Sequence, residues 1–452
     1  MPNQTQIHQT AGGHATQIGK VEGDAYITTY QHVRPQPVDK AALAAARRQL
    51  DALPLDRVPT PAPLPPCSRM PFPPNPLFVG RAPDLQTLAQ TLKRGKTAAV
   101  GQIAAATGLG GIGKTQLASE FAHRYGQYFA GGVFWLSFGD PRAIPAEIAA
   151  CGGAGKLDLR PNFAALPLPD QIRLVLSAWS SPLPRLLIFD NCEDQDLLAQ
   201  WRPPSGGARV LVTSRRREWS ATLGVRTLPL DVLPRPESIA LLHAHRPDLS
   251  DQEAGAGSST ILDDLAEELG DLPLALHLAG SFLAAYRRVV TPAAYLAQLR
   301  DAALLQHASL RGRGAEHSPT GHELHVGRTF ALSYERLDPG DETDAVALAL
   351  LARAACFAPG EPIPRRLLFA ALNLDEQDTE SALGIEDGLA RLAALGLLEA
   401  EAEGGLLLHR LLAAFVRQTA PTAAAQAAVE KTLLAQANRL NKAGYPAPLL
   451  AW

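Results

Sequence analysis

A glycine-rich segment between an apolar run and a helical pattern constrains this chain most; it reads Gly108-Leu109-Gly110-Gly111-Ile112-Gly113-Lys114-Thr115. Its glycines allow successive backbone N–H groups to curl around a β-phosphate at a helix N-terminus, where the helix dipole favours anions. Lys114 is spaced to reach the β- and γ-phosphates, and the Thr115 hydroxyl to bind Mg²⁺. A glycine-rich turn that merely precedes a helix is the alternative, but the order of strand, loop and helix favours a phosphate loop. We therefore predict a site for ATP or ADP with Mg²⁺, lined by Gly108, Gly110, Gly111, Ile112, Gly113, Lys114, Thr115 and Gln116.

Length and composition limit the remaining classes. A chain of 452 residues is long enough for three or four domains, and 46% hydrophobic residues are enough for their cores. No uncharged apolar stretch reaches the length of about 18 residues that a membrane span needs, so we expect a cytoplasmic protein with no transmembrane segment. The four cysteines stand singly and predict neither disulfides nor zinc. A net charge of −3 predicts no general attraction to nucleic acid.

The pattern along the chain predicts six segments. Residues 1–35 are rich in Gln, Thr, Gly and His, and residues 36–76 form a short helix followed by a stiff spacer with ten prolines. Residues 77–230 alternate apolar runs with helical patterns, which predicts an α/β domain with a doubly wound parallel sheet. Residues 231–325 predict an all-helical domain, and residues 326–420 helices that end in a small hairpin, as in a winged helix. Residues 421–452 begin a further helical region.

Two more residues fit a nucleotide site. The apolar run Leu186-Leu187-Ile188-Phe189 leads into Asp190, which is how a buried strand delivers a carboxylate to Mg²⁺; a plain turn aspartate is the alternative. Many P-loop ATPases carry a second acidic residue next, whereas this chain carries Asn191, so hydrolysis is in doubt or slow. A later strand ends at Arg215, whose guanidinium could sense a γ-phosphate, unless residues 215–217 are only a solvated basic turn. Asp190 and Arg215 are thus the candidate catalytic residues.

The order of these and further motifs resembles the NB-ARC module of the STAND class of signalling ATPases, to which NLR-like proteins belong. The resemblance covers roughly residues 77–420. Its motifs are Val79-Gly80-Arg81, the phosphate loop, the strand ending Asp190-Asn191, Val212-Thr213-Ser214-Arg215, Gly270-Asp271-Leu272-Pro273-Leu274-Ala275 and Leu408-His409-Arg410-Leu411.

The resemblance implies roles for three of these motifs. Val79, Gly80 and Arg81 would contact adenine through the backbone, and Pro273 would pack against the base. His409 would bind the β-phosphate of ADP and lock a closed form. The usual Met-His-Asp reads Leu408-His409-Arg410 here, so the ion pair expected of the aspartate is absent. For His409 the alternative is a purely structural histidine.

The N-terminal segment suggests an output. Thr16-Gln17-Ile18-Gly19 resembles the core of the amyloid signalling motifs found ahead of some bacterial NLR-like proteins, and the low-charge segment around it could stack in register. Gln17, Ile18 and Gly19 would form the amyloid core; a plain disordered tail is the alternative. A downstream effector with a matching motif would be the partner. The C-terminal residues look like the start of a TPR-like array, so we expect sensing through repeats beyond this chain or through a partner.

These observations predict an ADP/ATP-switched signalling NTPase that forms a homo-oligomer on nucleotide exchange and is at most a slow regulatory ATPase. A STAND-type transcription regulator and a turnover NTPase are the alternatives. A regulator would need a basic reading helix, but residues 386–398 carry only Arg391 as a basic residue, so we expect no nucleic-acid partner.

Overall fold

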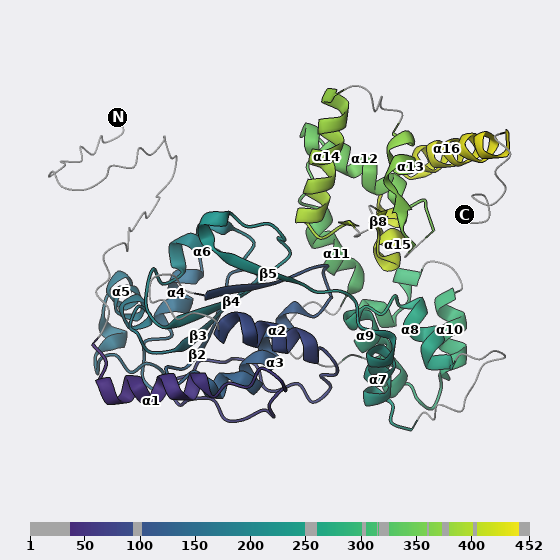
Figure 1. Ribbon diagram of the computed structural model, residues 1–452. Coiled ribbons are helices and arrows are strands. Elements are labelled where there is room, and N and C mark those ends of the chain that lie inside the picture. The colour runs from purple at the N-terminus through teal and green to yellow at the C-terminus, as the bar shows by residue number, and fades with distance from the viewer. Residues whose placement is uncertain are drawn as a thin grey trace, which may run out of the picture.

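The computed structural model describes residues 37–93, 102–248, 260–300, 304–313, 315, 325–358, 361–372, 379–400 and 405–442. They form a sheet unit, a helical unit and a C-terminal unit, coloured from purple to yellow in Figure 1. The predicted amyloid core Gln17, Ile18 and Gly19 lies outside the described residues.

The sheet unit contains five parallel strands in the order β2-β3-β4-β1-β5. Their bounds are β1 Gln102–Thr107, β2 Val133–Ser137, β3 Arg185–Asp190, β4 Ala208–Ser214 and β5 Val225–Pro229. The register pairs Thr107 with Ser214, so β1 and β4 end at one edge, and the aspartate that ends β3 reaches the same edge. Polar side chains that follow these strands therefore meet there.

Helices cover both faces of this sheet. Alternate strand residues point to opposite faces: Val133 and Trp135 join one core, and Phe134 and Leu136 the other. The helices of the first face are α2 Ala82–Lys93 and α3 Lys114–Tyr125, and those of the second are α4 Ile144–Ala149, α5 Leu168–Trp179 and α6 Gln195–Trp201. The predicted doubly wound α/β fold is confirmed.

The helical unit contains α7 Arg235–His245, α8 Ile261–Glu268, α9 Pro273–Ala285 and α10 Pro292–Arg300. Thr260 caps α8, since its side chain accepts from the backbone N–H of Asp263. A left-handed Gly270 (φ +62°) and Asp271 (φ +53°) form the tight turn between α8 and α9. That turn delivers Pro273 to the first position of α9, where proline is well tolerated.

The C-terminal unit combines helices with a small antiparallel sheet in the order β6-β8-β7. Its helices are α11 Val326–Tyr334, α12 Glu342–Ala354, α13 Arg365–Ala370, α14 Thr379–Ala394, α15 Arg410–Thr419 and α16 Ala423–Lys442, and its strands are β6 Ile363–Pro364, β7 Glu399–Ala400 and β8 Gly405–Leu407. The identification of this unit as a winged helix stays a prediction.

The proline-rich stretch after helix α1 (Lys40–Asp51) is extended, as predicted for a stiff spacer, but it also contacts the sheet unit. The backbone N–H of Ala62 donates to the carbonyl of His123, and Arg69 forms an isolated parallel bridge beside β2. The Arg69 guanidinium also pairs with Glu147 of α4 at 2.7 Å. The prolines exclude regular structure, yet the N–H groups between them can still form hydrogen bonds.

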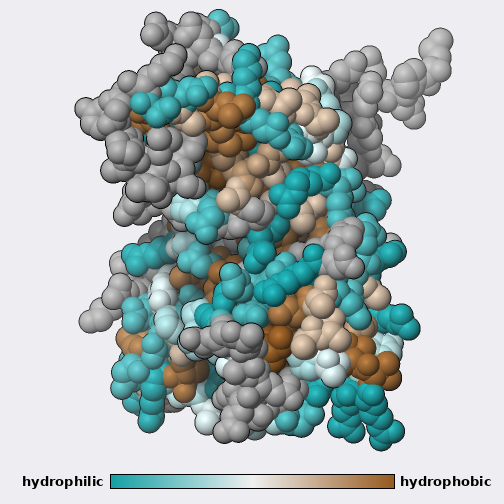
Figure 2. Space-filling model, turned by 90° about the vertical axis from the view of Figure 1, so that its right-hand side faces the viewer, coloured by the Kyte–Doolittle hydropathy of each residue, from teal (hydrophilic) through white to brown (hydrophobic). Residues whose placement is uncertain are grey.

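Among the described residues, none of the helices has both the length and the apolar character that a membrane crossing requires. On the face drawn in Figure 2, hydrophilic residues cover much of the surface and hydrophobic ones gather in smaller patches between them.

Candidate nucleotide-binding site

The glycine-rich loop connects β1 to α3 and needs its glycines. Gly108, Gly111 and Gly113 all have positive φ, and a Cβ on Gly108 would lie 2.8 Å from the carbonyl oxygen of Leu230. Gly113 is the N-cap of α3 and offers no side-chain cap. The N-terminal N–H groups of α3 thus lack a capping side chain, which fits a site for an anionic group such as a phosphate.

Lys114 lies folded against this loop. Its Nζ donates to the carbonyl oxygens of Gly108 and Leu109 at 2.8 and 2.9 Å, and the side chain is buried. Burial, and then the nearby charge of Arg215, lowers the pKa of Lys114 to about 7. A buried cation whose hydrogen bonds go to two neutral carbonyls would gain a counter-charge in direct contact from a phosphate, so the lysine fits the predicted ligand.

Asp190, at the end of β3, joins the loop to the neighbouring strand. Its Oδ1 accepts from the hydroxyls of Thr115, 2.8 Å away, and Thr213, 2.5 Å away. All three side chains are buried. A carboxylate beside a hydroxyl suits Mg²⁺, which takes one or two protein ligands together with phosphate oxygens. The structure thus brings together the two predicted metal ligands, Thr115 and Asp190.

A second carboxylate, Glu193, lies at the same edge and was not predicted as a site residue. Its oxygens accept from the hydroxyl of Ser214 at 3.0 Å and from the backbone N–H of Arg215 at 3.0 and 3.1 Å. Burial lowers the pKa of Arg215, which Glu193 partly offsets. Glu193 therefore positions the strand end that carries the candidate γ-phosphate sensor. Thr213, which donates to Asp190, was not predicted as a site residue either. Its position at the end of an apolar strand was the signal that could have identified it.

The predicted Val79-Gly80-Arg81 motif adjoins both the loop and the helical unit. Gly80 and Arg81 have positive φ, and the backbone N–H of Arg81 donates to Glu237 of α7 at 3.2 Å. The Arg81 guanidinium donates to the carbonyls of Ile112 at 3.1 Å and Asp231 at 2.6 Å. The arginine thus ties the phosphate loop to the connection that leads into α7, a role that the sequence did not indicate.

Pro273 also lies beside the loop. The backbone N–H of Leu274 donates to the carbonyl of Gly111 at 3.1 Å, and a Cβ on Gly113 would lie 4.0 Å from the Cβ of Pro273. Gln116 accepts from Asn75 at 3.1 Å. The structure therefore gathers the predicted loop residues and Pro273 at one place; the packing of Pro273 against adenine stays a prediction.

His409 lies between the C-terminal and helical units. Its Nδ1 accepts from the backbone N–H of Leu411 at 3.2 Å, so the proton belongs on Nε2, which donates to the carbonyl of Gly270 at 2.9 Å. Burial lowers the pKa of this imidazole to about 4. The C-terminal unit also reaches the loop itself, because a Cβ on Gly396 would lie 3.3 Å from the carbonyl oxygen of Gly108. The contact of His409 with a phosphate stays a prediction.

Acid should weaken the contact between His409 and the carbonyl of Gly270, and with it the contact between the C-terminal and helical units. The pKa of His409 is lowered from 6.5 to about 4 while it is held by Gly270. An imidazole that left this place would recover its ordinary pKa, so the separated form binds the extra proton. Lowering the pH from about 7.5 to about 5 should favour separation on the order of 30-fold, with no effect above about pH 7.

Small-angle X-ray scattering at the two pH values measures this as a larger radius of gyration. His409→Gln, which cannot take up the proton, should respond less, and this comparison subtracts the acid response of His245, whose pKa burial also lowers to about 4. Equal expansion of both proteins would contradict the assignment.

No protein-family model matches the chain. The regulatory protein AfsR of Streptomyces coelicolor is 30% identical over 350 residues, which cover 76% of this chain and 32% of that protein. A nucleotide-binding leucine-rich repeat (NLR)-like protein of Hyaloscypha variabilis is 26% identical over 375 residues, 76% of this chain and 35% of that protein.

The chain thus spans about a third of the length of the curated relatives it matches. Among solved structures, a signal transduction ATPase with numerous domains (STAND) and a tetratricopeptide repeat sensor from Pyrococcus horikoshii is 18% identical. The alignment covers 83% of this chain and 47% of that one, with a TM-score of 0.30.

Proposed function

We propose that the chain is a STAND-type signalling ATPase that acts as a switch controlled by the exchange of ADP for ATP; its similarity to the regulatory protein AfsR and to an NLR-like protein supports this proposal. With ADP bound, the C-terminal unit closes over the site; ATP opens it, and the opened chains assemble. One observation carries this proposal: residues of all three units meet at the phosphate loop. Leu274 of the helical unit donates to Gly111, and Gly396 of the C-terminal unit packs against Gly108.

A contact beside Arg215, the candidate γ-phosphate sensor, supports a link between the bound nucleotide and the position of the C-terminal unit. Glu193, which positions Arg215, lies 4.0 Å from the guanidinium of Arg336 in the C-terminal unit. A γ-phosphate near Arg215 would compete with Glu193 for the same positive charges. Changing a two-state equilibrium from 1:99 to 99:1 needs about 5.5 kcal/mol of differential affinity, which phosphate, Mg²⁺ and arginine contacts are able to supply.

Slow chemistry suits such a switch. The residue after Asp190 is Asn191, whose backbone N–H donates to Thr213 at 2.9 Å, and it offers no carboxylate to polarise water. Asp190 would hold Mg²⁺ with Thr115, and Arg215 would bind the γ-phosphate. We expect a long-lived nucleotide complex and at most slow hydrolysis, in contrast to a turnover NTPase.

The output follows from assembly. In an oligomer the N-terminal segments with Gln17, Ile18 and Gly19 would come close together, stack, and template an effector that carries a matching motif. Sensor input would come from a partner or from repeats beyond residue 452.

A transcription-regulator output is the second candidate, since one relative is named a regulatory protein. Against DNA binding stands the placement of Arg391, the one basic residue of residues 386–398. Its guanidinium is held by Asp344 at 2.7 Å and by the carbonyl of Arg336 at 3.0 Å. That arginine stabilises the unit internally, which leaves this segment without a free cation for DNA phosphates.

The switch is tested by the nucleotide that the purified chain carries and by its oligomeric state. We expect ADP on denaturation, and a monomer by light scattering after size-exclusion chromatography. Replacing ADP by ATP with Mg²⁺ should give a larger species. A monomer that stays unchanged in ATP, together with steady turnover, would overturn the proposal.

The Ile18→Asp variant separates assembly from fibril formation. It should bind nucleotide and assemble as the unaltered chain does, but should not increase thioflavin fluorescence, because each stacked layer would carry a charge. Normal fibrils in this variant would exclude the amyloid core.

A further inference from the structure

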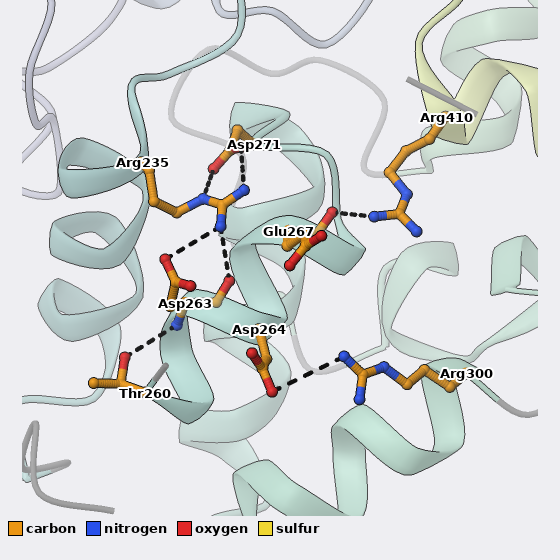
Figure 3. Close-up of polar contacts among 8 residues, drawn as sticks. All are labelled: Arg235, Thr260, Asp263, Asp264, Glu267, Asp271, Arg300 and Arg410. Atoms are coloured by element: carbon orange, nitrogen blue, oxygen red, sulfur yellow. Dashed lines mark hydrogen bonds and ion pairs between the residues drawn. The ribbon is translucent and has the colours of Figure 1, made fainter. Parts of the chain in front are cut away.

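Helix α8 of the helical unit is held by arginines from three different elements (Figure 3). Arg235 of α7 makes two bonds of 2.9 Å to the carboxylate of Asp271 and one of 3.2 Å to Asp263. These hydrogen bonds raise the pKa of Arg235. This cluster belongs wholly to the helical unit and fixes the turn between α8 and α9.

The C-terminal end of α8 is electrostatically unfavourable when taken alone. Glu267 and Glu268 lie at the negative end of the helix dipole, and the last turn contains no basic residue. Arg410, from the C-terminal unit, supplies the missing cation: it donates to the carbonyl of Glu267 at 2.5 Å and lies 3.4 Å from Oε1 of Glu268. Both contacts join two units, as Figure 3 shows for the contact with Glu267.

Glu268 has a second cation within its own unit. Arg300 of α10 lies 3.5 Å from Oε2 of Glu268, and 3.9 Å from Asp264. The two arginines therefore share one carboxylate, one oxygen each. If the C-terminal unit moves away, Glu268 loses Arg410 but keeps Arg300, so the carboxylate is not left without a cation.

The approach of α15 to this place depends on Gly270. A Cβ there would lie 2.8 Å from Nε2 of His409 and 3.0 Å from Cγ of Arg410. The start of α15 thus packs directly on the turn between α8 and α9, and this packing brings the Arg410 guanidinium to the end of α8.

We propose that Arg410 is a latch that holds the C-terminal unit closed, and that Glu268, shared by Arg410 and Arg300 in the closed form, keeps Arg300 alone when the unit opens. The inference rests on the proposed switch, whose regulation it specifies. Because Arg300 competes for the same carboxylate, the two arginines act with opposite sign on closure. The latch is partly exposed, and salt weakens it.

The test compares Arg410→Ala with its matched control Arg300→Ala in the full chain. Donor and acceptor dyes on α8 and α16 report the distance between the two units in the ADP-bound protein, and a fluorescent ADP analogue reports dissociation. Arg410→Ala should increase the open fraction and the ADP dissociation rate roughly three- to tenfold. Arg300→Ala should lower both, because Glu268 is then available to Arg410 alone.

Further measurements keep the result unambiguous. If Arg410→Ala does not fold, Arg410→Lys takes its place. It keeps the charge without the two-pronged contact, so it should still raise the open fraction and the ADP dissociation rate above those of the unaltered chain, but by less. Raising the salt concentration from about 0.1 M to about 1 M should open the unaltered chain more than Arg410→Ala. A change of the same sign in Arg410→Ala and Arg300→Ala, or none in Arg410→Ala, would overturn the latch. If the dyes respond to Arg410→Ala but not to nucleotide, the latch stands and the proposed switch fails.

Discussion

Lys114→Ala should be recovered from purification without nucleotide, with affinity for ADP and ATP reduced by about a hundredfold or more. Lys114 is the ammonium group within the loop, buried and held by the carbonyls of Gly108 and Leu109. A phosphate that entered the loop would gain a charge-assisted bond from it, in a place where solvent screening is weak. The nucleotide content after denaturation and a binding titration measure the effect.

Lys93→Ala is the matched control. Lys93 also donates to two carbonyls, those of Asp51 and Leu53, at the end of α1 and away from the loop. Its loss should lower stability while nucleotide stays bound. Nucleotide content in Lys114→Ala equal to that of the unaltered chain would remove the loop from the site.

Asp190→Ala should reduce the affinity for ATP in Mg²⁺ by roughly a hundredfold, and that for ADP less. Its carboxylate accepts from Thr115 and Thr213, and no other described residue places a carboxylate on the Thr115 hydroxyl. Removal of the carboxylate takes away the negative charge that would face Mg²⁺. It also leaves two buried hydroxyls without this acceptor, which should lower the free energy of unfolding by about 1–3 kcal/mol for each hydroxyl. Binding titrations with Mg²⁺ and with a chelator measure the difference.

Asp194→Ala serves as the control for this carboxylate. Asp194 caps α6 through Asp196 and Leu197, four residues along the chain but outside the site. We expect a loss of about 1 kcal/mol of stability and unchanged dependence on Mg²⁺. If Asp190→Ala keeps the full dependence of ATP binding on Mg²⁺, the metal assignment is wrong.

The sheet unit could be predicted because its signals are local. The phosphate loop and the apolar run that ends at Asp190 each encode their structure within a few residues, and parallel strands bring their ends to one edge. Pro273 lies by the loop, and its packing against adenine, which the resemblance implies, stays a prediction. These parts depend on spacing and burial alone.

The contacts between units could not be predicted in the same way. Arg410 meets Glu268 across 142 residues. Glu193 of the sheet unit lies 4.0 Å from Arg336 of the C-terminal unit, which is also far away along the chain. Charged residues carry no periodic signal for their partner, so their pairing emerges only from the packing of elements. The contact of His409 with the carbonyl of Gly270 likewise depends on a turn 139 residues earlier in the chain. The contact of His409 with a phosphate stays a prediction.

The proline-rich stretch has a consequence for geometry. Its backbone is fastened to α3 and β2, and α1 is fastened to the sheet unit by Lys93 and by Leu50 and Leu53 in the core. The chain ahead of Lys40 is thus attached at a fixed point on the sheet unit, which contains the candidate nucleotide-binding site. In an assembly, the arrangement of neighbouring sheet units would therefore set the distance between neighbouring N-terminal segments. Lengthening or shortening residues 54–76 would leave that distance unchanged.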